Sequence, residues 1–192
     1  KRSEQLASGE ANSLQSKARR QALLEQRYKP IVLRLRNIEK PIVCAVNGVA
    51  AGAGANIALA CDVVIAKNSA KFIQAFSKIG LIPDSGGTWM LPKLVGLQRA
   101  TALAYLGTPV GAPAAEAMGM IHRSIPNADF SAEVQALAET LANMPTRGLA
   151  LTKQAFNQGF EQSMDAQLDT EMELQATASR TGDFKEGVAA FL

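Results

Sequence analysis

The sequence has little of what marks several common protein classes. It contains two cysteines, one histidine and one tryptophan in 192 residues. Cys44 and Cys61 lie in apolar surroundings without a Cys-x-x-Cys or Cys/His grouping, so we expect small buried side chains and no metal or redox site. No apolar run reaches the length of about eighteen residues that a membrane span needs, and no leader pattern opens the chain. These absences predict no membrane association and a cytoplasmic protein.

The net charge of the chain is also small, at +3. Lys and Arg number 20 against 17 Asp and Glu, and the basic residues are scattered apart from Lys17, Arg19 and Arg20. This distribution argues against nucleic-acid binding. With 47% hydrophobic and 19% charged residues, the chain is long enough to bury a core.

Short apolar runs between glycine-rich turns predict an α/β fold. Residues 3–26 are polar, with helical spacing at Leu14, Ala18, Ala22 and Leu23. Pro30 is expected to open a helix that ends before Pro41. We expect strands at 42–46, 62–66, 71–74 and 120–125, a glycine loop at 48–56 leading into a helix at 57–60, and a turn at 80–91 leading into another. Further helices are predicted at 97–106, 113–118, 130–143, 146–160 and 164–180.

Two segments could carry chemistry. Gly52-Ala53-Gly54 could present backbone N–H groups to a developing oxyanion, although a tight turn would explain the same glycines. Asp84 is the only carboxylate in residues 80–91 and could transfer protons, although it could equally cap the next helix. His122 stands alone on an expected strand and favours a packed or surface imidazole. Trp89, Phe72 and Phe76 could line an acyl pocket or simply fill the core.

Several motifs together resemble the crotonase (enoyl-CoA hydratase/isomerase) superfamily. They are Lys40–Gly48, Ala50–Gly54, Ala60–Ala66, Gly80–Trp89, Leu94–Gly96, Ala114–Ile121 and Asp183–Phe191. The resemblance implies an α/β spiral of ββα units over residues 1–125 and a C-terminal helical trimerisation region over 126–192. It also implies that the first units of the spiral, with the other oxyanion donor, are missing from this chain.

The resemblance also assigns roles to single residues. The family's oxyanion N–H falls on Ala53, and the two glutamates of hydratases fall on Asn56 and Phe76. Asp84 occupies the place of the single acidic residue of isomerases. A substrate-contacting set is implied around these positions, comprising Gly52, Gly54, Asn56, Phe76, Pro83 and Trp89. No metal and no cofactor are implied, because coenzyme A is part of the substrate.

The runs Ala75–Lys78, Gly80–Asp84 and Gly86–Trp89 resemble the isomerase branch that acts on ring-epoxide phenylacetyl-CoA and shifts double bonds of enoyl-CoA from position 3 to 2. We therefore expect an acyl-CoA isomerase that forms a homotrimer or hexamer. The alternatives are an enoyl-CoA hydratase, an aryl-CoA dehalogenase that attacks with Asp84, and a non-catalytic acyl-CoA-binding or RNA-binding homologue. The weak positive charge makes nucleic acid an unlikely partner.

Overall fold

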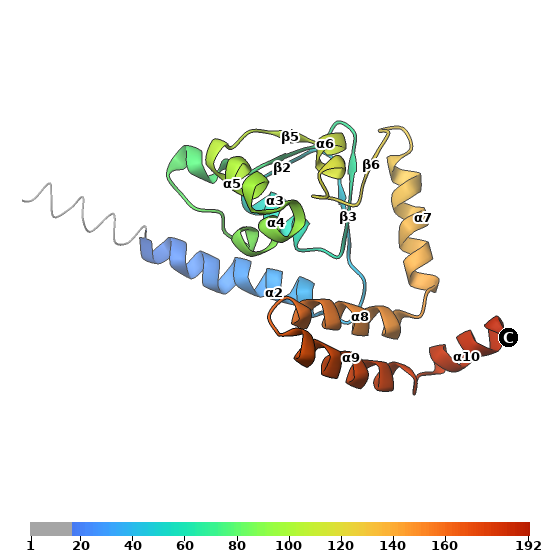
Figure 1. The fold of residues 1–192 in the computed structure, drawn as a ribbon. Coiled ribbons are helices and arrows are strands. Elements are labelled where there is room, and N and C mark those ends of the chain that lie inside the picture. The colour runs from blue at the N-terminus through green and yellow to red at the C-terminus, as the bar shows by residue number, and fades with distance from the viewer. Residues whose placement is uncertain (1–16) are drawn as a thin grey trace, which may run out of the picture.

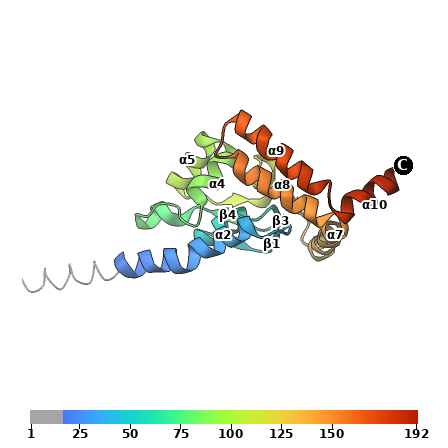
Figure 2. The ribbon, with the colours of Figure 1, turned by 90° about the horizontal axis from the view of Figure 1, so that it is seen from below.

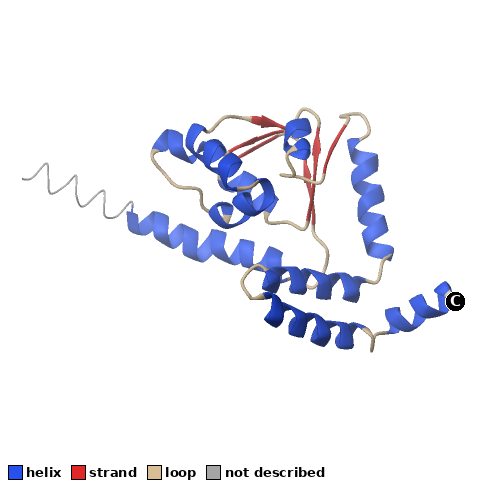
Figure 3. Ribbon diagram, viewed as in Figure 1, coloured by secondary structure: helices blue, strands red, loops and turns tan. Residues whose placement is uncertain are grey.

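A computed structural model describes residues 17–192 of the protein. Its strands are short and lie in two three-stranded sheets, with helices on the outside (Figures 1 and 3). The first sheet is parallel and contains β1 (Val43–Val46), β3 (Val63–Lys67) and β6 (Arg123–Ile125). The second contains β2 (Val49–Ala51), β4 (Lys71–Ile73) and β5 (Val110–Gly111), the last of which is antiparallel to β4.

The first four strands alternate between the two sheets, and β5 then joins the second sheet and β6 the first. β1 pairs with β3 through Val43 and Val63, and β2 pairs with β4 through Val49 and Lys71. The unit formed by β1 and β2 therefore stacks on the unit formed by β3 and β4. Helix α3 (Ala53–Leu59) follows β2 in the chain. Helix α4 (Gly87–Val95) follows β4, after the 3-10 helix η2 (Ala75–Ile79). This arrangement confirms the predicted α/β spiral of ββα units.

β3 is buried on both of its faces, as its apolar sequence predicts. Val64 and Ala66 belong to the larger core cluster, which includes residues of α3 and α4. Ile65 points to the other side, where it packs with Ile125 and with Phe130 of α7 (Phe130–Asn143). The alternation follows from the two-residue period of a strand. One strand thus joins the spiral core to the helices that follow it.

The glycine segment differs from the prediction. Residues 49–51, expected as loop, form β2, because they pair with β4. Helix α3 begins at Ala53 and not at residue 57, since Gly52 turns the chain sharply with φ +55°. The last predicted strand is also shorter, and spans 123–125 only.

The helix near Pro30 also differs from the prediction. Residues 17–37 are helical throughout, so Pro30 does not open the helix but lies inside it. A π-helical turn, η1 (Leu24–Tyr28), precedes α2 (Lys29–Asn37), and the Lys29 N–H donates to the Leu24 carbonyl five residues earlier. Proline lacks an N–H and its ring collides with the carbonyl four residues back, and the wider turn accommodates both. Leu14 of the predicted helical spacing lies outside the described residues.

The helices from α5 to α9 agree with the predicted segments to within a few residues, whereas the last helix, α10, was not predicted. α8 and α9 lie side by side, and α10 leads away from them to the C-terminus (Figures 1 and 2). Within residues 17–192, no helix is long and apolar enough to cross a membrane. These further helices are α5 (Leu97–Leu106), α6 (Ala112–Ala117), α8 (Thr146–Gly159), α9 (Met164–Ala178) and α10 (Gly182–Phe191).

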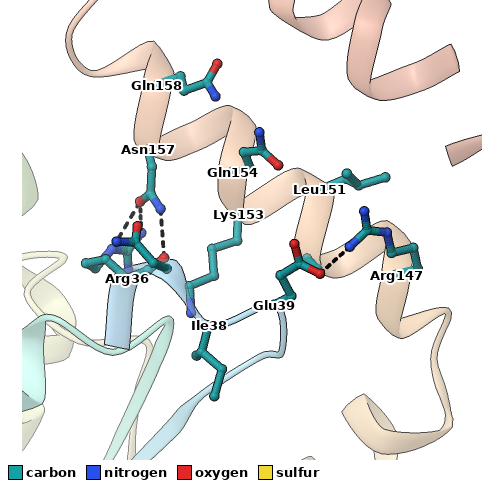
Figure 4. A pocket seen from close by; sticks show the side chains of 11 residues that line it. Arg36, Ile38, Glu39, Arg147, Leu151, Lys153, Gln154, Asn157 and Gln158 are labelled. Carbon is teal, nitrogen blue, oxygen red and sulfur yellow. Dashed lines mark hydrogen bonds and ion pairs between the residues drawn. The ribbon is translucent and has the colours of Figure 1, made fainter. Parts of the chain in front are cut away.

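A cluster of buried charges attaches α8 to the spiral. The Asp62 carboxylate accepts from Arg36 at 3.1 Å, from Lys153 at 2.8 Å and from the Ile42 N–H at 2.9 Å. Asn157 of α8 donates to the Arg36 carbonyl at 2.9 Å. Figure 4 shows this polar contact beside a cavity of 280 Å³ between the end of α2 and α8. This cluster could not be predicted from the sequence, because its members lie far apart in the chain.

Candidate active site

The predicted oxyanion donor lies where β2 passes into α3. Gly52 has φ +55° and ψ −126°, a conformation that residues with a Cβ rarely adopt. Its N–H donates to the Ile73 carbonyl at 2.8 Å and so extends the β2–β4 pairing by one residue. Ala53 is then the first residue of α3, where a backbone N–H has no acceptor one turn earlier in its own helix. The fold therefore leaves this N–H available for another acceptor.

Asp84 lies in a tight turn ahead of α4. The Gly87 N–H donates to the Asp84 carbonyl at 2.9 Å, and the two residues between them, Ser85 and Gly86, have φ of +52° and +81°. Positive φ at both central positions is the mark of a type I′ turn, and it is costly for serine. The half-buried Asp84 carboxylate accepts from the Ser85 hydroxyl at 2.9 Å.

The alternative role of Asp84 as a helix cap is wrong. The N-cap of α4 is Gly86, and no side chain caps this helix end. The turn carries the chain through Ser85 before the helix begins, so Asp84 stands two residues too early to cap it. Its carboxylate is therefore not committed to the first turn of α4.

Asn56 links the two segments. Its side chain is fully buried, and its Nδ2 donates to the Asp84 carbonyl at 2.8 Å. Its Oδ1 accepts from Nε2 of Gln74 at 2.8 Å. Ala53 stands three residues before Asn56, about one helical turn away on the same face of α3. Asn56 thus connects the helix that begins at Ala53 to the turn that contains Asp84.

The packing around this link is tight. A Cβ on Gly87 would stand 2.1 Å from Asn56 Nδ2, so this position requires glycine. Val32 of α2 lies 3.4 Å from where a Cβ on Gly86 would stand. Helix α2 therefore packs against the Asp84 turn from the outside.

The other predicted contact residues divide into two groups. Phe76 is buried, and its ring lies 3.7 Å from the place of a Cβ on Gly52, the residue before the predicted oxyanion donor. Pro83 is half-buried beside Asp84, and Gly54 lies in open space on α3. Trp89 packs edge-on against Phe160 at the end of α8, at 5.1 Å between ring centres. The described contacts of Trp89 therefore join α4 to the end of α8.

Lys93 belongs to the same contact as Trp89. Its ammonium stands 3.2 Å from the centre of the Trp89 ring and 4.2 Å from that of Phe160. A cation over an aromatic face attracts the ring electrons, so this arrangement strengthens the joint between α4 and α8.

The cysteines and the histidine take no part in this arrangement. Cys44 and Cys61 are free, half-buried and packed against the larger core cluster, as predicted. A hydrogen bond to Cys44, together with burial, raises the pKa of Cys61 above its usual range and keeps that thiol protonated. His122 is exposed, as one of its two predicted readings had it.

Comparison with known proteins bears on this arrangement. The sequence model described as enoyl-CoA hydratase/isomerase matches residues 6–192. This chain belongs to the enoyl-CoA hydratase/isomerase family. The membership agrees with the motifs quoted above and with the spiral fold. An enoyl-CoA hydratase of known structure from Polaromonas sp. JS666 superimposes with a TM-score of 0.87 at 30% identity, over 97% of this chain and 72% of that one.

Relatives within the enoyl-CoA hydratase/isomerase family carry different activities in their names. The 1,2-epoxyphenylacetyl-CoA isomerase of Escherichia coli (strain K12) is 51% identical over 88% of this chain and 64% of its own length. A probable enoyl-CoA hydratase of Rhodobacter capsulatus is 45% identical over 90% of this chain and 67% of its own. The chain thus spans somewhat less than two thirds of the E. coli relative, and the names do not agree on one reaction.

Sequence reasoning missed Gln74 and the turn residues Ser85 and Gly87. Gln74 was the last residue of a predicted strand, and a glutamine at the end of an apolar run was the only signal. The close approach of Gly87 to Asn56 depends on how α3 and α4 cross, which no local pattern encodes.

Proposed function

We propose that this protein is an acyl-CoA isomerase in which Asp84 transfers the proton and the Ala53 N–H stabilises the oxyanion. The observation that carries the proposal is the Asn56 hydrogen bond to the Asp84 carbonyl, because it ties the Asp84 turn to the helix that begins at Ala53. The 51% identity to the E. coli epoxyphenylacetyl-CoA isomerase supports the same choice.

Two groups of this chain take part in the proposed chemistry. In a 3-enoyl thioester, removal of a proton from carbon 2 by the Asp84 carboxylate would move negative charge onto the thioester oxygen. The Ala53 N–H would donate to that oxygen, and one such donor typically contributes a rate factor of about 100 or more. Return of the proton from Asp84 to carbon 4 would leave the double bond at position 2. A ring-epoxide phenylacetyl-CoA is the second proposed substrate, and coenzyme A enters only as part of the thioester.

Enoyl-CoA hydratase is the second candidate, favoured by the 45% identity to the Rhodobacter relative. Addition of water by the two-glutamate route needs two proton-transfer groups. Asn56 and Phe76 stand at those positions by family resemblance, and neither side chain exchanges a proton near neutral pH. In addition, the Asn56 amide is already bonded at both ends within the protein.

A homotrimer, or a hexamer of two trimers, in the cytoplasm is part of the same proposal. Large apolar residues remain exposed on α9 and α10, and exposed patches of this kind mark interfaces. They are Leu168, Met172, Phe184, Val188 and Phe191.

The test is Asp84→Asn in the full-length protein. The amide keeps the shape of the carboxylate and can still accept from Ser85, but it cannot take a proton. Isomerisation of a 3-enoyl-CoA and of the ring-epoxide substrate should fall by about 100-fold or more. Acyl-CoA binding and the oligomeric state should not change. The control is Asp129→Asn, the exposed N-cap residue of α7, whose side chain makes no capping hydrogen bond. Wild-type turnover of both substrates by Asp84→Asn would refute the mechanism.

A further inference from the structure

Asn56 and Gln74 form a buried pair of amides in a largely apolar region. Asn56 is fully buried and Gln74 is 5% exposed. Among the described residues, Gln74 Oε1 has no hydrogen-bond partner. Polar groups in such surroundings are costly to bury and hold a single geometry when they are bonded. The pair therefore calls for an explanation beyond the filling of space.

The two amides end on the main chain of Asp84. Gln74 Nε2 donates to Asn56 Oδ1, which leaves Asn56 Nδ2 directed at the Asp84 carbonyl. Apart from this bond, the Gly87 N–H is the other described donor to that carbonyl. The turn contains Ser85 at positive φ, a conformation disfavoured for a residue with a Cβ. The Asn56 amide thus supports a turn whose backbone conformation is unfavourable for Ser85.

We propose that Asn56 is a positioning residue for Asp84 and that Gln74 orients Asn56. By holding the Asp84 main chain, the amide fixes the direction from which the carboxylate reaches the substrate. This inference rests on the proposed function of Asp84. It gives the asparagine at a hydratase-glutamate position a part in isomerisation that requires no contact with substrate.

The main test is Asn56→Asp, which keeps the size of the side chain. Burial raises the pKa of the introduced acid. Of the residues in contact with Asn56, Gln74 and Gly87 carry no charge, and the only basic residue of α4, Lys93, lies over the Trp89 ring. The protonated acid can still donate to the Asp84 carbonyl, whereas the ionised acid cannot and would repel it.

The ratio of the variant's kcat to the wild-type kcat should therefore depend on pH. It should approach one at low pH and fall by about 100-fold as the introduced acid ionises, the usual cost of a misplacement near 1 Å. KM should change little, because Ala53 lies outside the altered contact. The control is Asn127→Asp, an exposed amide bonded to Ser69, which should match wild type at every pH.

Gln74→Met is the second variant, in case Asn56→Asp fails to fold. Methionine has nearly the same shape and removes the buried Oε1 that lacks a partner, which offsets the lost bond to Asn56. The melting temperature should change little while kcat falls about tenfold. A pair without a positioning role would leave the kcat of the folded protein unchanged.

The outcomes separate this inference from the proposed function. If Asp84→Asn is inactive but Asn56→Asp and Gln74→Met keep wild-type kcat at all pH values, only the positioning role is refuted. A rise in KM that matches the loss in kcat/KM would also refute it. If Asp84→Asn remains active, the proposed function itself fails.

Discussion

Asp62→Asn should destabilise the protein far more than the loss of a typical surface ion pair would. Asp62 is 17% exposed and faces two cations, Arg36 at 16% and Lys153 at 7%. The asparagine keeps the shape and can still accept from the Ile42 N–H, but the charge that balances Lys153 is gone. Loss of one partner from a buried ion pair costs about 3–5 kcal/mol. Because Asp62 and Arg36 retain some contact with water, we expect the lower end, about 3 kcal/mol.

For a chain of this length, a loss of about 3 kcal/mol corresponds to a fall in melting temperature of about 6–12 °C. Thermal unfolding followed by circular dichroism measures it. The matched control is Glu39→Gln. It removes the carboxylate that pairs with Arg147, which lies on α8 as Lys153 does, and Glu39 is 68% exposed. An exposed pair contributes less than about 1 kcal/mol. Equal falls for the two variants would refute the view that buried charges hold α8 on the spiral.

Three further predictions concern the site and the assembly. Gly87→Ala should lower both stability and isomerase activity, because the new Cβ would stand 2.1 Å from Asn56 Nδ2. The control Gly111→Ala places its Cβ in open space and should match wild type in thermal unfolding and turnover. The protein should hydrate crotonyl-CoA little or not at all, because Asn56 and Phe76 cannot exchange protons, and a rate typical of a dedicated hydratase would overturn that assignment. Sedimentation of the full-length protein should give a trimer or hexamer, and a stable monomer would contradict the proposed interface on α9 and α10.

The sequence was a good guide where burial alone decides structure. The apolar run before Lys67 predicted β3, and the family motifs predicted the spiral. It was a poor guide where a distant partner decides. Residues 49–51 carry no strong strand pattern and become a strand only because β4 lies beside them. The division at residues 125 and 126 stays a prediction.

The site was predictable only in part for the same reason. The segments of Ala53 and Asp84 carried local motifs, and the motifs identified them. Asn56 was noted for the carboxylate that it lacks, and its bond to the Asp84 carbonyl could not be foreseen, because the partner lies 28 residues away. Gln74 and Lys153 depend in the same way on neighbours that only the folded chain supplies.

The π-helical turn before Pro30 has a consequence for how mutations at the start of the helix are interpreted. It contains one residue more than an α-helical turn, and each residue of an α-helix advances the chain by about 100°. A helical wheel drawn as one regular spiral through residues 17–37 therefore assigns the wrong face to everything before Leu24. Deletion of a single codon within 24–28 would let this turn close as a regular α-helical turn, and the residues before it would keep their faces relative to α2. In an alignment of relatives, such a gap would therefore indicate loss of the π-helical turn and no change in which side chains face the spiral.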